Sequence, residues 1–318
     1  MAREILEGCK ILLHTCGGVK KDEKVLVITD ETSHEIGAAM YQCAAGFTDA
    51  TWVCTEDRST HGEAPTDCVA AAMQEADVIF SATTFSLYNT DARIEACKRG
   101  ARFVNMADYS LSMLREGCLF TDWEEIRRQV DATAKKIVRE LRITTSAGTD
   151  FWTSIEGRHA DVGYGTSIHR GEASSPPDAE CAVGPADDSA KGVLVIDGSV
   201  PLPGLGLLEK PIYLMVEEGY ITKIEGGREA EILKKSLADF DDPRVYLVAE
   251  VGFGLNPAAS LSGRLLEDEG VYGTMHIGIG NNLAYGGTCR TPIHIDLILK
   301  NPTCMVDDHY VYKDGILI

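Results

Sequence analysis

Positive charge is scarce in this chain and is nowhere clustered. The 318 residues include 30 Lys and Arg against 49 Asp and Glu, which gives a formal net charge of −19. Nucleic acids and anionic membranes bind to basic patches, so the composition argues against both as partners. Most of the carboxylates must be solvated surface, because few cations are available to pair with them.

Long apolar runs are also missing. Residues 1–9 carry charges where a secretory signal needs an apolar segment, and no apolar run approaches the roughly 18 residues of a membrane span. The ten Cys are scattered and include no Cys-x-x-Cys pair, which is typical of reduced and mostly buried thiols. We therefore expect a cytoplasmic protein without a membrane span.

Several catalytic motifs are absent as well. The turn after the first predicted strand, residues 29–34, has no Gly-x-Gly-x-x-Gly and carries negative charge where a pyrophosphate would bind. The chain has no Gly-x-Ser-x-Gly, and Cys181 follows Glu180, whose charge would raise the pKa of the thiol. The sequence thus argues against dinucleotide binding and against covalent catalysis.

The chain does contain enough apolar residues, 44%, to fill packed cores. In the first 142 residues, short apolar runs alternate with segments of helical periodicity, which is the pattern of a parallel α/β sheet. The predicted strands are 24–30, 50–55, 76–81 and 101–106. The predicted helices lie within 1–19 and at 33–45, 68–76 and 89–99.

The pattern changes after a charged helix predicted at 121–142. From there the chain has short strands, many Gly and frequent turn signals, with only one further clear helix, at 228–240. We therefore predict two domains. Residues 1–142 form an α/β, Rossmann-like domain without a dinucleotide motif, and residues 143–318 form a β-rich α+β domain that binds metal and carries the catalytic residues.

The second predicted domain holds the residues that point to a metal site. His294 and Asp296 are two apart in an apolar strand and so lie on one face of it. Glu250 ends another apolar run, where a carboxylate needs a positive partner, and His276 lies in a run whose glycines permit close backbone approach. These residues suggest a divalent metal, while a polar strand face and a core histidine are the simpler interpretations.

Several segments, in this order, resemble the thermophilic aminopeptidase T family of dinuclear metallopeptidases. They are 148–150 with Arg158, 180–185, 188–198, 249–254, Glu269 with 276–280, and 294–296. By this resemblance, the ligands of two divalent cations are Glu180, Glu250, Glu269, His276, His294 and Asp296, and the active-site tyrosine is Tyr285. Periodicity alone selects neither Glu180, in a predicted loop, nor Tyr285. Asp268 is the alternative to Glu269.

A second resemblance extends over the whole length, to the 2,5-dihydroxypyridine dioxygenases, which are mononuclear iron ring-cleaving enzymes. The segments that carry it are 146–151, 217–222, 226–231 and 286–292. The iron site of that family resembles a His, His, Asp facial triad. Its first histidine falls at Glu250 here, and Glu180 and His276 have no counterparts in it.

Three interpretations follow, and the first is the leading prediction. It is a metallo-aminopeptidase or amide hydrolase with two Zn, Co or Mn ions, in which Glu180 handles the proton and Tyr285 donates to the oxyanion. The second is an Fe(II) ring-cleaving dioxygenase for a hydroxypyridine-like aromatic, with Glu250, His294 and Asp296 as the facial site. The third is a scaffold or storage protein with a degenerate site. We expect a peptide or small-molecule substrate and a homo-oligomer, a dimer or larger.

Overall fold

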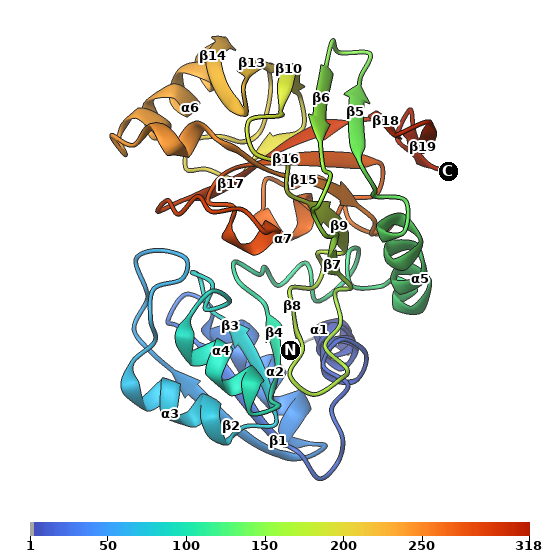
Figure 1. Cartoon of the computed structure of the whole chain (residues 1–318). Coiled ribbons are helices and arrows are strands. Elements are labelled where there is room, and N and C mark those ends of the chain that lie inside the picture. The colour runs from blue at the N-terminus through green and yellow to red at the C-terminus, as the bar shows by residue number, and fades with distance from the viewer. Residues whose placement is uncertain (1–2) are drawn as a thin grey trace. The chain divides into compact units, whose positions relative to one another are not determined.

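Alternating strands and helices near the N-terminus build a parallel sheet, as the sequence predicts (Figure 1). The computed structural model describes residues 3–318, and β1 (Lys24–Thr29), β3 (Val78–Ala82) and β4 (Arg102–Asn105) lie at the centre of this sheet. The strand order is β2-β1-β3-β4-β8, with β2 (Asp49–Cys54) and β8 (Ala173–Ser174) at the edges. All neighbouring strands are parallel.

Helices connect these strands, and two of them begin at side-chain caps. The helices of this part of the chain are α1 (Arg3–Lys10), which continues as a π-helix over Ile11–Cys16, α2 (His34–Ala45), α3 (Asp67–Glu75) and α4 (Asp91–Lys98). The two with side-chain caps are α3 and α4. The Thr66 hydroxyl accepts a hydrogen bond from the backbone N–H of Val69, and Thr90 does the same for Arg93. Each cap satisfies a backbone donor that the first helical turn leaves unpaired.

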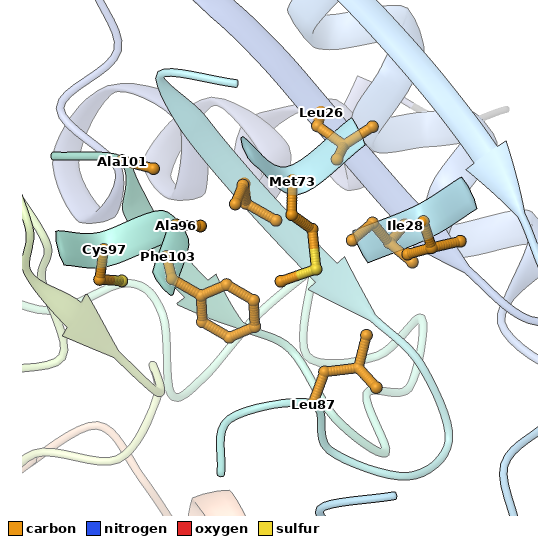
Figure 2. Packing of buried hydrophobic residues seen from close by; sticks show 10 residues of the cluster. Leu26, Ile28, Met73, Leu87, Ala96, Cys97, Ala101 and Phe103 are labelled. Atoms are coloured by element: carbon orange, nitrogen blue, oxygen red, sulfur yellow. The ribbon is translucent and has the colours of Figure 1, made fainter. Parts of the chain in front are cut away.

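The apolar core of this part of the chain lies between the sheet and α3 and α4 (Figure 2). Leu26, Ile28, Ile79 and Phe103, from three neighbouring strands, cluster with Met73 of α3. None of these five side chains is more than 3% exposed. Burying an apolar side chain of this size stabilises the fold by about 1.5–3 kcal/mol, so this cluster holds the helices on the sheet.

The rest of the chain is built mainly from antiparallel strands. One sheet has eight strands in the order β14-β13-β10-β6-β5-β18-β19-β20, and a second has five in the order β17-β16-β15-β9-β7. The strands of the larger sheet are β5 (Glu140–Thr144), β6 (Asp150–Ser154), β10 (Lys191–Ile196), β13 (Ile212–Glu217), β14 (Tyr220–Gly226), β18 (Thr303–Val306), β19 (His309–Lys313) and β20 (Ile316–Leu317). The strands of the smaller sheet are β7 (Asp161–Gly163), β9 (Glu180–Val183), β15 (Val248–Gly254), β16 (Thr274–Gly280) and β17 (His294–Lys300).

Short elements complete this part. A two-stranded ribbon pairs β11 (Ser199–Val200) with β12 (Gly206–Leu207). The helices are α5 (Trp123–Ala134), α6 (Arg228–Ala238) and α7 (Leu265–Asp268), with 3-10 turns at Pro243–Tyr246 and Leu283–Tyr285. The helix predicted at 121–142 therefore ends early, because residues 140–144 pair with β6 and β18 as strand β5. Among residues 3–318, no helix is long and apolar enough to cross a membrane.

The chain divides into two compact units. The N-terminal unit comprises Met1–Glu124, described from Arg3, together with Tyr164–Pro177, and the C-terminal unit comprises Glu125–Gly163 and Asp178–Ile318. A parallel sheet with helices and a set of antiparallel sheets confirm a two-domain α/β fold. The assignment of separate roles to residues 1–142 and 143–318 stays a prediction.

Candidate metal centre

One face of the five-stranded sheet in the C-terminal unit carries five of the predicted site residues. In the register of the sheet, each of them lies beside a glycine of a neighbouring strand. The pairs are Glu180–Gly254, Glu250–Gly278, His276–Gly252, His294–Gly280 and Asp296–Gly278. Paired residues, and residues two apart in one strand, share a face of the sheet, so all five side chains project from the same side.

Two of these glycines make room for the imidazole rings. A Cβ atom on Gly252 would lie 1.9 Å from Nε2 of His276. A Cβ atom on Gly278 would lie 2.6 Å from Nε2 of His294 and 2.8 Å from Cβ of Glu250. Real side chains do not approach this closely, so the two histidines occupy space that only glycine leaves free.

Glu250 joins the five side chains into one cluster. Its Oε2 lies 2.7 Å from Nε2 of His294, and its Oε1 lies 3.4 Å from Nε2 of His276. The Oε2 atom of Glu180 is 3.0 Å from the His276 ring, and Oδ1 of Asp296 is 3.3 Å from the His294 ring. Glu250, His276 and Asp296 are at most 3% exposed, which makes this a buried cluster of charge.

The orientation of the His294 ring shows that this cluster requires a positive charge between the ring and the carboxylates. Its Nδ1 lies 2.7 Å from the backbone oxygen of Asn281, which accepts a hydrogen bond from that nitrogen. In the neutral ring Nε2 therefore carries a lone pair, and this lone pair faces the carboxylates of Glu250 and Asp296. Such an arrangement needs a positive charge between the ring and the carboxylates, either a proton or a cation. A histidine ligand typically donates its second N–H to a carbonyl in this way.

The residues fit a divalent cation. Two groups bring their ligand atoms within 4.8 Å of one another: Glu180, Glu250 and His276, and Glu250, His294 and Asp296. Among the described residues, Oε2 of Glu180 and Oδ1 of Asp296 are buried without a hydrogen-bond partner. Unpaired buried carboxylate oxygens are costly, and coordination to a cation would satisfy them.

The two groups are not equally supported. The His294 ring is oriented by the Asn281 carbonyl, whereas Nδ1 of His276 is buried without a hydrogen-bond partner in residues 3–318. Because partners of the distal ring nitrogen fix the orientation and raise the basicity of a metal ligand, the His294 group is the better prepared of the two.

The ionisation of the cluster also shows its need for positive charge. Burial favours a neutral ring, but Asp296 and Glu250 raise the pKa of His294 well above its ordinary value. Burial opposes the charge on Asp296, yet His294 holds the pKa of this carboxyl below its usual range. Burial raises the pKa of Glu180 to about 7, although His276 acts in the opposite direction. The protons that the histidines hold would be displaced by a bound cation.

Two other predicted residues lie beside this cluster. Burial and the charge of Asp296 raise the pKa of Glu269 well above its ordinary value. The ring of Tyr285 lies 5.5 Å from that of His294, centre to centre, at an interplanar angle of 32°. Burial and Glu250 raise the pKa of Tyr285 well above its usual value, which keeps the phenol protonated.

Asp268, the alternative to Glu269, has a different environment. Its carboxylate accepts hydrogen bonds from the Ser199 hydroxyl and from the backbone N–H groups of Ser262 and Gly263. These three bonds connect α7 to the loop before it and to β11. Asp268 is thus placed as a structural carboxylate, and Glu269 is the one of the pair that lies near Asp296.

The structure adds one acid that the sequence reasoning missed. Asp178 is 7% exposed, and its Oδ1 has no hydrogen-bond partner in the part of the chain that the structure describes. Burial and the charge of Glu180 raise its pKa well above the usual value. Glu180 begins strand β9 and does not lie in a loop, because it pairs with Gly254 and Gly163. Alternation from Glu180 back to Asp178 was the signal that would have found this residue.

The fold and the site together define a two-unit protein with a buried cluster of carboxylates and histidines on an antiparallel sheet, in which two groups of residues could hold a metal ion. Comparison with known proteins identifies the family. The family model described as 2,5-dihydroxypyridine 5,6-dioxygenase matches residues 4–318, and the chain belongs to this family. A curated 2,5-dihydroxypyridine 5,6-dioxygenase of Pseudomonas putida is 30% identical over 257 residues, which cover 78% of this chain and 72% of the relative.

Two solved structures share the fold. The structure of 2,5-dihydroxypyridine dioxygenase from Pseudomonas putida KT2440 matches with a TM-score of 0.83 and 24% identity, over 98% of this chain and 96% of that one. Wild-type AmpT from Thermus thermophilus matches with a TM-score of 0.71 and 14% identity, over 99% of both chains. At these identities the two likenesses show the fold alone.

These findings correct the leading prediction. The expectation of a metallo-aminopeptidase or amide hydrolase is wrong, since the family model and the curated relative both point to a dioxygenase. The leading prediction rested on the likeness of the ligand set to that of the peptidases, whereas the whole-length resemblance pointed to the dioxygenases. A common fold places similar side chains at the same sheet positions, so the types of the candidate ligands alone do not identify the reaction. The individual roles of Glu180, Tyr285 and the six predicted metal ligands stay predictions.

Proposed function

We propose that this chain is an Fe(II)-dependent ring-cleaving dioxygenase that acts on a hydroxypyridine-like aromatic. The observation that carries the proposal is the group formed by Glu250, His294 and Asp296, in which the Asn281 carbonyl turns Nε2 of His294 towards both carboxylates. Membership of the dioxygenase family supports the choice of reaction. A facial group of imidazole and carboxylate ligands with open positions is typical of non-haem Fe(II) oxygenases.

In this proposal Glu250, His294 and Asp296 hold the iron, which supplies the O2 chemistry when it is bound. The set has one imidazole and two carboxylates, so it is harder and more anionic than a facial triad of two histidines and one carboxylate. Two carboxylates would neutralise both charges of a ferrous ion within a buried site. This neutrality offsets the cost of bringing the charges out of water.

The neighbouring side chains have roles in handling protons. Glu180 would accept a hydroxyl proton from the hydroxypyridine-like substrate beside the residues that would hold the iron. The pKa of Glu180, raised by burial to about 7, suits a base that works near neutral pH. The ring of His276, whose Nε2 lies 3.0 Å from Oε2 of Glu180, would stabilise the negative charge of the Glu180 carboxylate before it accepts the proton. The protonated phenol of Tyr285 would donate a hydrogen bond to the substrate from beside the His294 ring.

A second cation is the alternative for Glu180 and His276. These residues form a three-ligand group with Glu250, and the second cation is favoured by Oε2 of Glu180, which is buried without a hydrogen-bond partner among residues 3–318. The number and kind of metal ions per chain therefore distinguish one iron from two Zn, Co or Mn ions. The same protein preparation answers both this question and the choice of reaction.

The test measures metal per chain and oxygen uptake on protein purified without chelators. We expect about one iron per chain and one O2 consumed per 2,5-dihydroxypyridine. His294→Ala should lose the iron, while His309→Ala, at an exposed position of strand β19, is the matched control and should keep it. Two metal ions per chain that fall to one in Glu180→Ala would favour the second cation. Absence of oxygen uptake by the iron-loaded protein would overturn the proposed reaction.

A further inference from the structure

The loop between β16 and β17 carries Tyr285 and is organised from within by one residue. The backbone oxygen of Asn282 accepts hydrogen bonds from the N–H groups of Tyr285, at 3.1 Å, and Gly287, at 3.0 Å. The side-chain oxygen of Asn282 accepts a further bond from the N–H of Cys289, at 2.8 Å. These bonds shape the loop, but they leave its position on the sheet to other contacts.

Arg158 supplies contacts of that kind. Its Nε donates to the backbone oxygen of Pro185 at 3.1 Å, and its Nη1 donates to the backbone oxygen of Gly286. Its Nη2 bonds to Oδ1 of Asp187 at 2.6 Å, and the side chain is 14% exposed. The guanidinium thus connects the chain just after β9 to the residue that follows Tyr285.

The Tyr285 backbone rests directly on the same segment. A Cβ atom on Gly184 would lie 2.6 Å from the backbone oxygen of Tyr285 and 2.9 Å from its Cβ. Gly286 has a φ of +77°, which is the left-handed conformation that turns the loop back towards Arg158. Gly184 and Pro185 follow the strand that begins at Glu180, so a shift of this contact would move Tyr285 relative to the proposed base.

We propose that Arg158 is a positioning residue that sets the place of the Tyr285 phenol in the ring-cleaving reaction; this inference rests on the proposed function. Arg158 does not serve the substrate directly, because three of its nitrogens are engaged by two carbonyls and a carboxylate. An arginine is required here since its planar fork bonds two carbonyls at fixed separation while Asp187 balances its charge. A lysine keeps the charge but offers one nitrogen.

The decisive experiment is a double-mutant cycle between Arg158→Lys and Tyr285→Phe. A misplacement of about 1 Å at a reacting group costs up to about a hundredfold in rate. We expect Arg158→Lys to lower kcat for 2,5-dihydroxypyridine by about tenfold to a hundredfold, with KM and iron content less affected. In the Tyr285→Phe background the same change should cost almost nothing, because the positioned hydroxyl is already gone.

Two variants serve as controls. Arg142→Lys changes an exposed ion pair, with Asp150 at 2.9 Å, in the same unit and should leave kcat unchanged. Asp187→Asn retains both carbonyl bonds of Arg158 and should lower kcat less than Arg158→Lys does. A full loss of rate from Arg158→Lys in the Tyr285→Phe background would overturn the inference, since Arg158 would then act through general stability.

Amide hydrogen exchange separates this inference from the proposed function. Arg158→Lys and Gly184→Ala should both speed exchange in a peptide that covers residues 283–289, whatever the substrate is. Unchanged exchange there would overturn the positioning role even if the dioxygenase activity is found. Faster exchange in a chain without oxygen uptake would confirm that Arg158 holds the loop and would refute the reaction that we assign to it.

Discussion

At the scale of single residues, the metal centre depends as much on glycines as on ligands. Gly278 lies between Glu250 and Asp296 in the sheet register, and a Cβ atom there would collide with the His294 ring. A buried polar cluster tolerates little displacement, since each member is held by the others. The glycines are therefore part of the site although they offer no ligand atom.

We predict that Gly278→Ala lowers the affinity for Fe(II) by about tenfold to a hundredfold, as the loss of a group that orients a metal ligand does. The added methyl group must push His294 or Glu250 away from the other ligands. Gly252→Ala would displace His276 and should spare a cation held by Glu250, His294 and Asp296, the group proposed to bind the iron. Titration of the metal-free variants with Fe(II) under anaerobic conditions measures both affinities.

Gly46→Ala is the control for this comparison. A Cβ atom at Gly46 would have its nearest neighbours at 3.5 and 3.6 Å, which is ordinary contact, so this substitution should leave metal affinity unchanged. If Gly252→Ala weakened binding more than Gly278→Ala, the primary cation would have to be assigned to the Glu180 and His276 group.

At the scale of elements, one carboxylate connects two strand ends in the N-terminal unit. Asp30 follows β1 and accepts hydrogen bonds from the N–H of Ser33 at 3.0 Å, the hydroxyl of Ser33 at 2.7 Å and the N–H of Thr84 at 2.5 Å. Ser33 precedes α2, and Thr84 follows β3. Although burial opposes its charge, the bonds from Thr84 and Ser33 hold the pKa of Asp30 below its ordinary value.

A carboxyl group whose pKa is lower in the folded state than in the unfolded state stabilises the fold. This stabilisation is complete at pH values above the pKa in the unfolded chain, about 3.9 for Asp, and it is lost as the pH falls through the pKa in the folded state. Asp30→Ala should therefore lower the free energy of unfolding by about 1–3 kcal/mol at neutral pH, since buried donors lose their acceptor. The difference from the parent chain should shrink as pH falls below about 4. Urea unfolding at several pH values measures it, and a difference that grows in acid would contradict the assignment.

Most elements of the fold follow from local pattern, and the exceptions have tertiary causes. The predicted strand 24–30 corresponds to β1, because a short continuous apolar run marks it, and the predicted helix 228–240 corresponds to α6, where apolar residues recur at helical spacing. The sequence predicts residues 140–142 as the end of a charged helix, but they belong to β5 (Glu140–Thr144), which pairs with β6 and β18. Local sequence contains no information about such partners, which lie far away in the chain.

Part of the candidate metal site could also be predicted from the sequence. Alternation placed His294 and Asp296 on one face, and the structure brings Glu250 and His276 to the same face. Asp178 was not predicted, because the sequence places Glu180 in a loop, where alternation back to Asp178 carries no information; the structure has Glu180 at the start of β9. The choice of reaction could not be made from ligand types alone, since acidic residues and histidines on one sheet face suit several metals and several reactions.

At the scale of the whole molecule, the two compact units provide an internal comparison for metal binding. Each unit has its own buried apolar residues, such as Phe103 in one and Phe253 in the other, both 0% exposed. The candidate ligands all belong to the C-terminal unit. A cation that binds only to the folded state stabilises it by about 2.7 kcal/mol at a concentration of 100 times its Kd.

We predict that Fe(II) slows amide hydrogen exchange in the strands that carry its ligands and not in the parallel sheet of the N-terminal unit. Slow exchange reports the free energy of opening of the unit to which an amide belongs, and the candidate ligands belong to the C-terminal unit. Mass spectrometry of anaerobic samples with and without Fe(II) should show protection in β15, β16 and β17, with β1 and β3 as the reference. Equal protection in β1 and β3 would mean that the chain opens as a single cooperative unit, and the division into two separately stabilised domains would then be wrong.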